Sequence, residues 1–150
     1  MTINQLIDIL NPITNDNHHF ELQLVQMNND NGNVYYRNSI NNNVHQNCGV
    51  YVVCNQMNNE ILYIGKGGTI KNDGTFKDQN LNGRLLASRG KEYSTSYKYF
   101  KHKMNQHNLE IVEIYVIYTN MNNPPAFIEA ISLKHYFNIN NSLPLLNDEF

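Results

Sequence analysis

Two short apolar runs separated by a polar turn constrain the fold of this chain more than any other feature of its sequence. The first run is GVYVVC at 49–54, the second is EILYIG at 60–65, and NQMNN connects them. Short runs rich in β-branched and aromatic residues are typical of strands, and a short polar connection joins antiparallel neighbours. The sequence therefore predicts a hairpin here, although the turn does not fix its register.

Apolar spacing and capping residues predict four helices in the rest of the chain. The expected helices are residues 3–10, a short helix that Asn82 caps and that stops at Gly90, a helix at about 96–107 behind Ser94 or Thr95, and one at about 125–137 that Pro124 and Pro125 open. Residues 67–80 carry glycines and scattered lysines without periodicity, so we expect an exposed loop there.

Three further stretches predict strands. Residues 110–118, EIVEIYVIY, are typical of a buried strand. Residues 19–27 and 33–40 flank the turn-rich NNDNGN, which predicts a second hairpin with Asn31 and Gly32 at its tip.

A chain of 150 residues is long enough for one domain with a sizeable core. We expect an α+β fold in which residues 47–150 form a small antiparallel three-stranded sheet flanked by helices. Residues 1–46 are expected to be an N-terminal extension, a helix and a hairpin, that packs on this core. This extension would either add strands to the sheet or form a contact in a possible homodimer.

Charge is distributed unevenly along the chain. The net charge is −2, yet residues 66–103 carry nine lysines or arginines and three acidic residues, whereas 1–65 and 104–150 each carry one basic and five acidic residues. A basic middle is typical of a surface that faces phosphates, and it is equally compatible with a solvated lysine-rich helix face. Charge alone leaves both alternatives open.

The two cysteines and the N-terminus indicate a compartment. Cys48 and Cys54 flank one expected strand about 20 Å long, which is too far for a disulfide, so we expect two free thiols in a reducing cytoplasm. The first ten residues do not resemble a signal peptide, and no run is apolar and long enough to suggest a membrane span.

The glycines in ILYIGKGGT, residues 61–69, do not have the spacing of a nucleotide pocket. A P-loop needs two glycines five positions apart before Lys and Ser or Thr, and a dinucleotide fingerprint needs a glycine where Ile70 stands. The glycines therefore call for another explanation.

The tripeptides Gly49-Val50-Tyr51 and Tyr63-Ile64-Gly65, on neighbouring strands of one hairpin, resemble the signature of the GIY-YIG nuclease superfamily. Four further residues follow in the order of that family. They are Lys66, Arg84 on the next helix, Glu129 on a helix after a buried strand, and Asn147 after a short apolar segment. The resemblance covers about residues 47–148 and leaves 1–46 outside.

The resemblance implies a metal-dependent DNA endonuclease that hydrolyses phosphodiester bonds. Glu129 would hold one divalent cation, Mg²⁺ or Mn²⁺, and Arg84 would bind the phosphate through its planar fork. Helical spacing from Glu129 to Leu133 and Tyr136 predicts the edge of a buried stripe, where a carboxylate needs a partner. A salt bridge to a lysine or to Arg84 is the alternative to a metal ion.

The resemblance also implies that Tyr51 takes a proton from the attacking water. A tyrosine with the ordinary pKa of about 10 is a poor base at neutral pH, so we expect Lys66, Arg84 and the metal to lower it. Tyr63 would orient water or phosphate, and Asn147 would fix the geometry of the site. Each tyrosine taken alone is also compatible with an ordinary core position.

Five other residues are expected to contact the substrate. Gly65 and Gly67 would let the chain pass close to the DNA, Arg89 is a second candidate for the phosphate ligand, and Lys98 and Lys101 add basic charge on the following helix.

Two features depart from the family pattern. The first is Ser88, which stands where many members of the family have a histidine, and the second is a longer loop between Gly65 and Arg84.

Two alternative functions are compatible with the sequence. They are a non-catalytic nucleic-acid-binding module with the same fold and an unrelated structural α+β protein.

Overall fold

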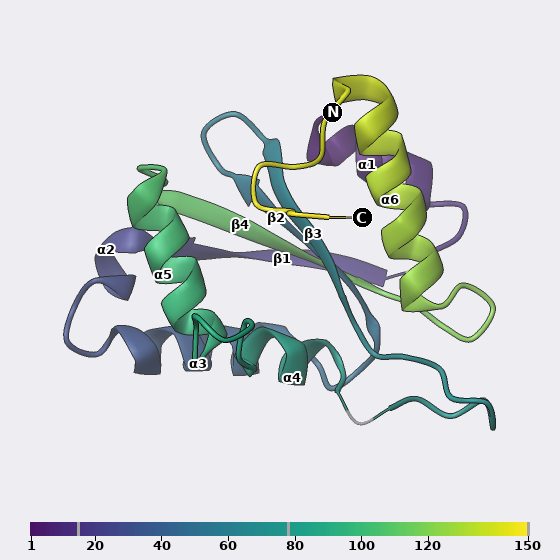
Figure 1. Cartoon of the computed structure of the whole chain (residues 1–150), viewed down its shortest axis with the longest axis horizontal. Helices are drawn as coiled ribbons and strands as arrows, with labels where there is room; N and C mark the ends of the chain where they lie inside the picture. Colours follow the sequence, from purple (N-terminus) through teal and green to yellow (C-terminus); the bar gives the residue numbers. More distant parts are fainter. Residues whose placement is uncertain (15, 78, 150) are drawn as a thin grey trace.

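In the computed structural model, which describes residues 1–14, 16–77 and 79–149, four antiparallel strands form one sheet in the order β1-β4-β2-β3 (Figure 1). The strands are β1 (Asp16–Gln23), β2 (Gly49–Asn55), β3 (Glu60–Gly67) and β4 (Ile111–Tyr118). The predicted α+β class is confirmed, but the sheet has a fourth strand. This strand comes from the N-terminal segment, since β1 pairs with β4 from Asp16 opposite Tyr118 to Gln23 opposite Ile111.

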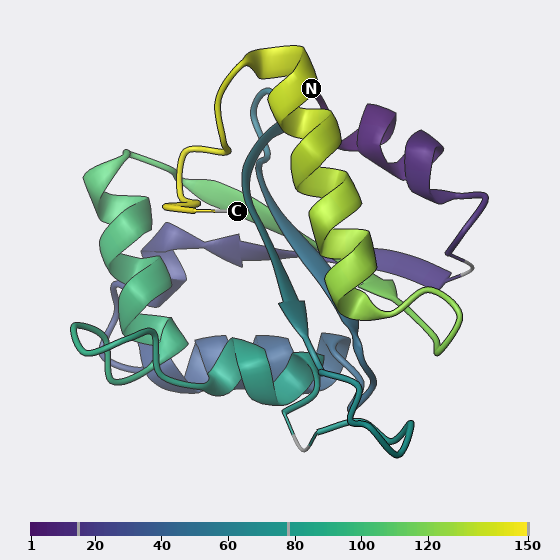
Figure 2. The ribbon, with the colours of Figure 1, turned by 45° about the vertical axis from the view of Figure 1, so that its right-hand side comes forward.

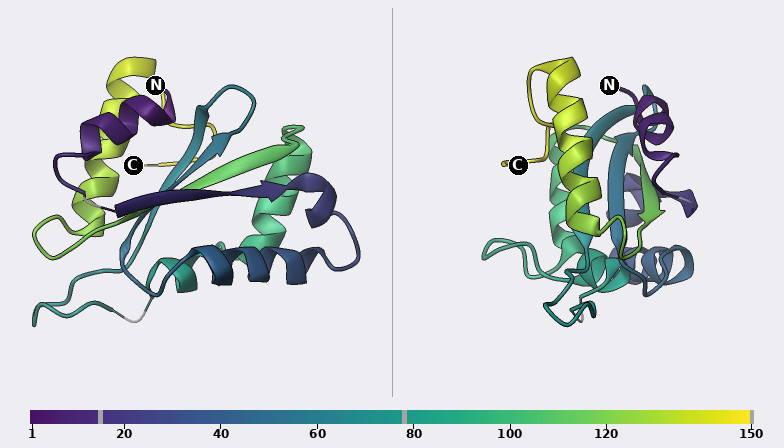
Figure 3. Two further views of the ribbon diagram at one scale, coloured as in Figure 1. Left: turned by 180° about the vertical axis from the view of Figure 1, so that it is seen from behind. Right: turned by 90° about the vertical axis from the view of Figure 1, so that its right-hand side faces the viewer.

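Helices cover both faces of the sheet, as Figures 1 and 3 show. Within the described residues the helices are α1 (Ile3–Leu10), α2 (Leu24–Met27), α3 (Gly32–Asn43), α4 (Leu81–Leu86), α5 (Ser96–Gln106) and α6 (Pro125–Asn140). Buried residues of α1 and α6 pack with Val50, Val52 and Ile64 on one face. Buried residues of α3, α4 and α5 pack with Tyr51 and Val53 on the other.

The predicted strand over 33–40 is wrong, because these residues belong to helix α3. Tyr36 and Ile40, four positions apart, are both buried on the face that meets the sheet. Gly32 is the first residue of the helix, and a Cβ atom there would lie 2.1 Å from the Met27 carbonyl oxygen, so the close packing of the turn requires glycine. The predicted strand over 19–27 is correct only as far as Gln23, after which α2 begins.

The N-cap of α4 differs from the prediction, and the N-cap of α5 is one of the two residues predicted for it. Asn80, not Asn82, caps α4 by accepting a hydrogen bond from the Gly83 N–H, and the helix ends at Leu86, before Gly90. Asn82 instead donates to the Val44 carbonyl. At α5 the cap is Thr95, whose hydroxyl accepts from the Lys98 N–H.

The β2–β3 hairpin is confirmed and contains a bulge that places two successive residues, Leu62 and Tyr63, on one face. The register shifts between Val53, which pairs with Tyr63, and Cys54, which pairs with Ile61, so Leu62 is the extra residue. Paired residues share a face, so Tyr63 lies with Val53 and Tyr51, and Ile64 points to the α6 face. The bulge adds Leu62 to the face of Tyr63.

The C-terminal segment returns from α6 to β3, which is an edge of the sheet, and runs beside it (Figure 2). The Leu146 N–H donates to the Leu62 carbonyl at 2.8 Å. Cys48 and Cys54 are buried free thiols, as predicted. Within the described residues, no helix has the length and apolar character needed to cross a membrane.

Candidate active site

Tyr51 on β2 and Tyr63 on β3 place their rings side by side on one face of the hairpin. The ring centroids lie 5.5 Å apart, and the planes meet at 28°. Gly65 pairs with Tyr51 across the strands, and a Cβ atom at position 65 would lie 2.5 Å from Cε1 of Tyr63 and 2.9 Å from the Tyr51 hydroxyl. Glycine at position 65 therefore makes the room that the two rings occupy.

The guanidinium of Arg89 joins the two tyrosine hydroxyls. Its Nη1 donates to the Tyr63 hydroxyl at 3.0 Å, and its Nη2 donates to the Tyr51 hydroxyl. Its Cζ lies 5.2 Å from the centroid of the Tyr63 ring. Because arginine stays protonated in proteins, a permanent cation lies against both hydroxyls. Lys66, Arg84 and a metal ion were expected to supply positive charge here, whereas Arg89 makes the direct contacts with the hydroxyls.

Three side chains of α5 hold this guanidinium in place. The buried Ser96 hydroxyl accepts from Nε of Arg89 at 3.2 Å and donates to the Ala87 carbonyl at 2.7 Å. The rings of Tyr99 and Phe100 lie 5.1 and 5.4 Å from the Arg89 Cζ. None of the three was predicted as a site residue. Their spacing of i, i+3 and i+4 was the available signal, because it places them on one helix face.

Tyr51 is fully buried, and the expectation that neighbouring cations lower its pKa is wrong for the described structure. Burial raises the pKa of Tyr51 well above its ordinary value, Tyr63 raises it further, and the cation of Arg89 offsets only part of the rise. A general base works best when its pKa lies near the operating pH. Tyr51 is a hydrogen-bond acceptor for Arg89, and Tyr63 is the ring that lines both the cavity at α4 and α6 and the cavity along α5.

A cleft of about 240 Å³, here called the first cleft, lies where β3 meets α4 and α6. Arg84 reaches it from α4, Glu129 from α6, and Tyr63 and Lys66 from β3. These four predicted site residues therefore line one cavity, although Tyr63 and Lys66 belong to opposite faces of the sheet. The edge position of β3 makes this possible, because a cleft at the edge of a sheet is reached from both faces.

Lys66 and Glu129 form an ion pair across the first cleft. Nζ of Lys66 lies 2.6 Å from Oε2 of Glu129, and 36% of the lysine and 20% of the glutamate side chain are exposed. The alternative partner expected for Glu129, a lysine, is thus the one observed. The predicted position of Glu129 at the edge of the buried stripe of α6 is also confirmed, since Ile128 and Leu133 are buried beside it.

The donor set of the first cleft fits a cation held jointly with substrate and does not fit a site made by protein ligands alone. Within the described ranges, no three side chains of His, Cys, Asp or Glu are grouped closely enough to hold a metal ion. Glu129 is the carboxylate that lines the first cleft. Mg²⁺ commonly takes one or two carboxylates and completes its shell with waters and substrate phosphate oxygens, which is the arrangement that Glu129 allows.

A larger cavity of about 540 Å³, here called the second cleft, shares Tyr63 and Arg84 with the first. It extends from them along α5. Cations and carboxylates both line it, together with aromatic rings. The charged residues of its wall, besides Arg84, are Arg89, Lys91, Glu92, Lys103, Asp148 and Glu149.

Asn147 fixes the C-terminal segment against β3 next to Tyr63. Its side-chain oxygen accepts from the Ile64 N–H at 2.9 Å, and its side-chain nitrogen donates to the Ile64 carbonyl at 2.8 Å. The amide thus completes the backbone hydrogen bonds of one residue at the sheet edge. The contact holds Asn147 beside the candidate site, where the resemblance implied a geometric role for it.

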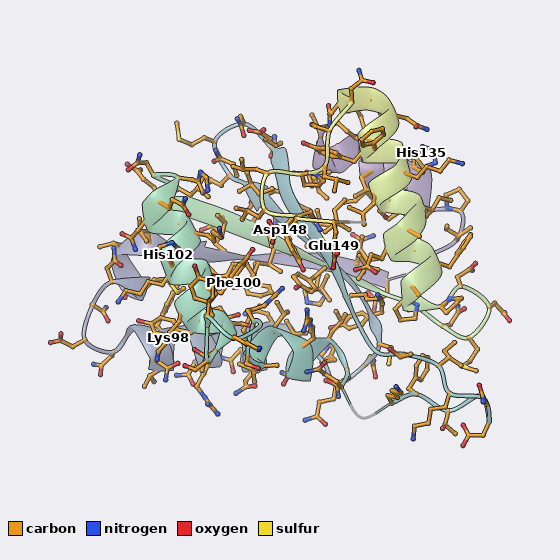
Figure 4. All side chains as sticks on the ribbon, in the orientation of Figure 1. Lys98, Phe100, His102, His135, Asp148 and Glu149 are labelled. Carbon is orange, nitrogen blue, oxygen red and sulfur yellow. The ribbon has the colours of Figure 1, made fainter. Side chains whose placement is uncertain are left out.

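The predicted substrate-binding residues are divided between the clefts and other surfaces. Gly67 lines the first cleft and also lets β3 approach α4, since a Cβ atom there would lie 2.6 Å from the Leu81 Cα. Lys101 points toward α2, where its Nζ lies 3.4 Å from the Tyr97 hydroxyl. Lys98 is exposed near the start of α5 (Figure 4), whereas Lys103, which was not predicted, lines the second cleft.

Comparison of the chain with protein-family models, with curated proteins and with solved structures gave no match. The function of the site is therefore inferred from its own residues and their geometry.

Proposed function

We propose that this protein is a metal-dependent DNA endonuclease of the GIY-YIG type, which hydrolyses phosphodiester bonds in the first cleft. The observation that carries the proposal is that a guanidinium, an ammonium group, a carboxylate and a phenol line one cavity. These groups belong to Arg84, Lys66, Glu129 and Tyr63. They come from segments far apart in the chain, and together they supply what hydrolysis of an anionic ester requires.

The two cations neutralise the phosphate. Arg84 donates two parallel hydrogen bonds to its non-bridging oxygens, which is the geometry that guanidinium favours. Lys66, once released from Glu129, donates to a phosphate oxygen or to the leaving oxygen. The Lys66–Glu129 pair closes the site before DNA enters, and its opening frees both charges for substrate and cation.

Glu129 is the residue that would hold a divalent cation, Mg²⁺ or Mn²⁺, together with a phosphate oxygen. When bound there, the cation supplies Lewis-acid stabilisation of the phosphate and lowers the pKa of a coordinated water. Among the described residues Glu129 is the carboxylate that lines the first cleft, so we expect the affinity of the free protein for Mg²⁺ to be weak and to rise when DNA is present.

Tyr63 positions the attacking water. Its hydroxyl accepts from Arg89 and keeps its own O–H for a water or phosphate oxygen in the cleft. Tyr51 acts at a distance, because it shares Arg89 with Tyr63 and packs beside its ring. Tyr51 and Arg89 are therefore positioning residues for Tyr63.

Cleavage of supercoiled plasmid with Mg²⁺ tests the proposal. Wild-type protein is expected to cut, and Glu129→Ala is expected to lose about a hundredfold or more in rate while still binding DNA. Glu110→Ala, which removes an exposed carboxylate just before β4, is the control and keeps the wild-type rate. Equal cutting by wild type and Glu129→Ala would refute the assigned role of Glu129.

The Lys66–Glu129 contact at 2.6 Å favours one other candidate, a non-catalytic DNA-binding module of the same fold. In such a module the ion pair is permanent and Glu129 never takes a cation. Absence of cutting by wild type and Glu129→Ala alike, with DNA binding intact in both, would support the module.

DNA binding is expected to depend on Lys103 more than on Lys98, although both lie on α5. Lys103→Ala removes a charge from the second cleft, so it lowers the slope of log affinity against log salt concentration by about one. Lys98→Ala is the matched control, because it removes the same charge outside the clefts. Fluorescence anisotropy with a labelled duplex at several salt concentrations measures both variants. Equal effects would contradict the expectation that Lys103, in the second cleft, lies closer to the DNA than Lys98.

A further inference from the structure

The second cleft is built differently from a surface that only follows a phosphate backbone. Its walls contain the side chains of Tyr63, Tyr93 and Tyr99 beside the cations. Its volume of about 540 Å³ lies within the range of cavities that enclose small organic ligands. Aromatic walls of this kind bind nucleic-acid bases by stacking, and each stacked base contributes substantially to affinity.

Tyr93 is held at the rim of this cavity by its backbone and by neighbouring rings. The Arg89 N–H donates to the Tyr93 carbonyl at 2.9 Å, which closes the turn between them. The ring of Tyr93 meets the Tyr99 ring edge-on at 5.4 Å and lies 5.7 Å from the His102 ring. Tyr93 remains half-buried, so part of its side chain is open to the cleft.

Among the described residues, the wall of the second cleft carries three carboxylates beside its four cations, so it offers hydrogen-bond acceptors to a base as well as positive charge to the neighbouring phosphates. Asp148 and Glu149 line the cavity, and Figure 4 shows them between α5 and α6. Asn147 comes just before these two residues in the chain. Two hydrogen bonds to Ile64 hold it against β3. Carboxylates repel a phosphate but accept hydrogen bonds from the amino groups of bases.

We propose that the second cleft binds an unpaired base of the DNA next to the scissile phosphate, with Tyr93 as its stacking surface. This inference rests on the proposed nuclease function and adds a substrate class: DNA with a single-stranded end, a flap or a bulged nucleotide. A paired base cannot enter, because both its faces are covered within the duplex stack. The shared wall residues, Tyr63 and Arg84, join the base pocket directly to the first cleft.

Binding without divalent cation tests this inference, since no cutting occurs under that condition if the proposed function holds. The probes are two labelled duplexes of equal length, one fully paired and one with a single bulged 2-aminopurine. Wild-type protein is expected to bind the bulged duplex about tenfold more tightly and to quench the 2-aminopurine fluorescence by stacking. Tyr93→Phe keeps the preference and the quenching, whereas Tyr93→Ala and Tyr93→Leu, which lack a ring, lose both.

Each outcome of this experiment either supports or overturns the base pocket. Equal affinity of wild type for the two duplexes, or a preference and quenching that Tyr93→Ala and Tyr93→Leu retain, would overturn the base pocket and leave the nuclease proposal intact. Failure of the wild-type protein to bind either duplex would overturn both. A preference that follows the aromatic ring at position 93 supports the pocket.

Discussion

Arg89→Ala is expected to lower the free energy of unfolding by about 3 kcal/mol, the largest effect of any substitution at the site. The substitution removes the donor to the buried Tyr51 hydroxyl and the contacts with Tyr99 and Phe100. A buried hydroxyl that loses its charged donor and the lost packing both destabilise the folded state. Urea denaturation followed by far-ultraviolet circular dichroism measures the change.

Two other arginine variants serve as controls for this prediction. Arg84→Ala removes a guanidinium that lines the clefts, so it changes stability by no more than about 0.5 kcal/mol while it impairs cleavage. Arg89→Lys keeps the charge but lacks the planar guanidinium that donates to both tyrosine hydroxyls. The stability of this variant is therefore expected to lie between those of wild type and Arg89→Ala. A loss below about 1 kcal/mol for Arg89→Ala would show that the tyrosine hydroxyls do not depend on it.

Gly65→Ala is expected to lower the free energy of unfolding by about 2 kcal/mol, because its Cβ atom overlaps both tyrosine rings. The contacts of 2.5 Å to Tyr63 and 2.9 Å to Tyr51 are shorter than van der Waals packing permits. The rings must move, and the hydroxyl of Tyr63 moves with them. A loss of cleavage rate is therefore expected together with the loss of stability.

Gly83→Ala is the matched control for this substitution. A Cβ atom at position 83 in α4 meets its nearest neighbour, Oδ1 of Asn80, only at 3.5 Å. Alanine in a helix is favoured over glycine by about 0.5–1 kcal/mol, so Gly83→Ala raises the free energy of unfolding. Denaturation curves of the two variants are expected to move in opposite directions, and a Gly65→Ala protein as stable as wild type would contradict the crowding argument.

Local sequence patterns predicted those elements whose neighbours in sequence decide their structure. The β2–β3 hairpin, α5, β4 and α6 all follow from apolar periodicity and caps. Helix α3 was missed because Val34, Tyr35 and Tyr36 favour strands locally, whereas the packing of Tyr36 and Ile40 against the sheet stabilises a helix. Strand β1 was recognised, but its pairing with β4 depends on contacts about ninety positions apart in the chain.

The residues of the candidate site also fall into two groups, those that the order of motifs predicts and those that depend on long-range packing. The order of motifs predicted Tyr63, Arg84 and Glu129, which share the first cleft. The central place of Arg89 could not be read from the sequence, because it depends on how the turn after α4 folds back onto Ser96. The burial of Tyr51 depends on long-range packing in the same way.

The central claim is that Arg84 and Glu129 act on one phosphate in one cleft, and their coupling tests it most directly. Single-turnover cleavage of a duplex with Mg²⁺ is measured for wild type, Arg84→Ala, Glu129→Gln and the double variant. Groups that act as a unit lose most of their effect when either is removed, so the double variant is expected to cut no more slowly than the slower single variant. Rate losses that multiply in the double variant would contradict the claim, because they would mean that the two residues act independently.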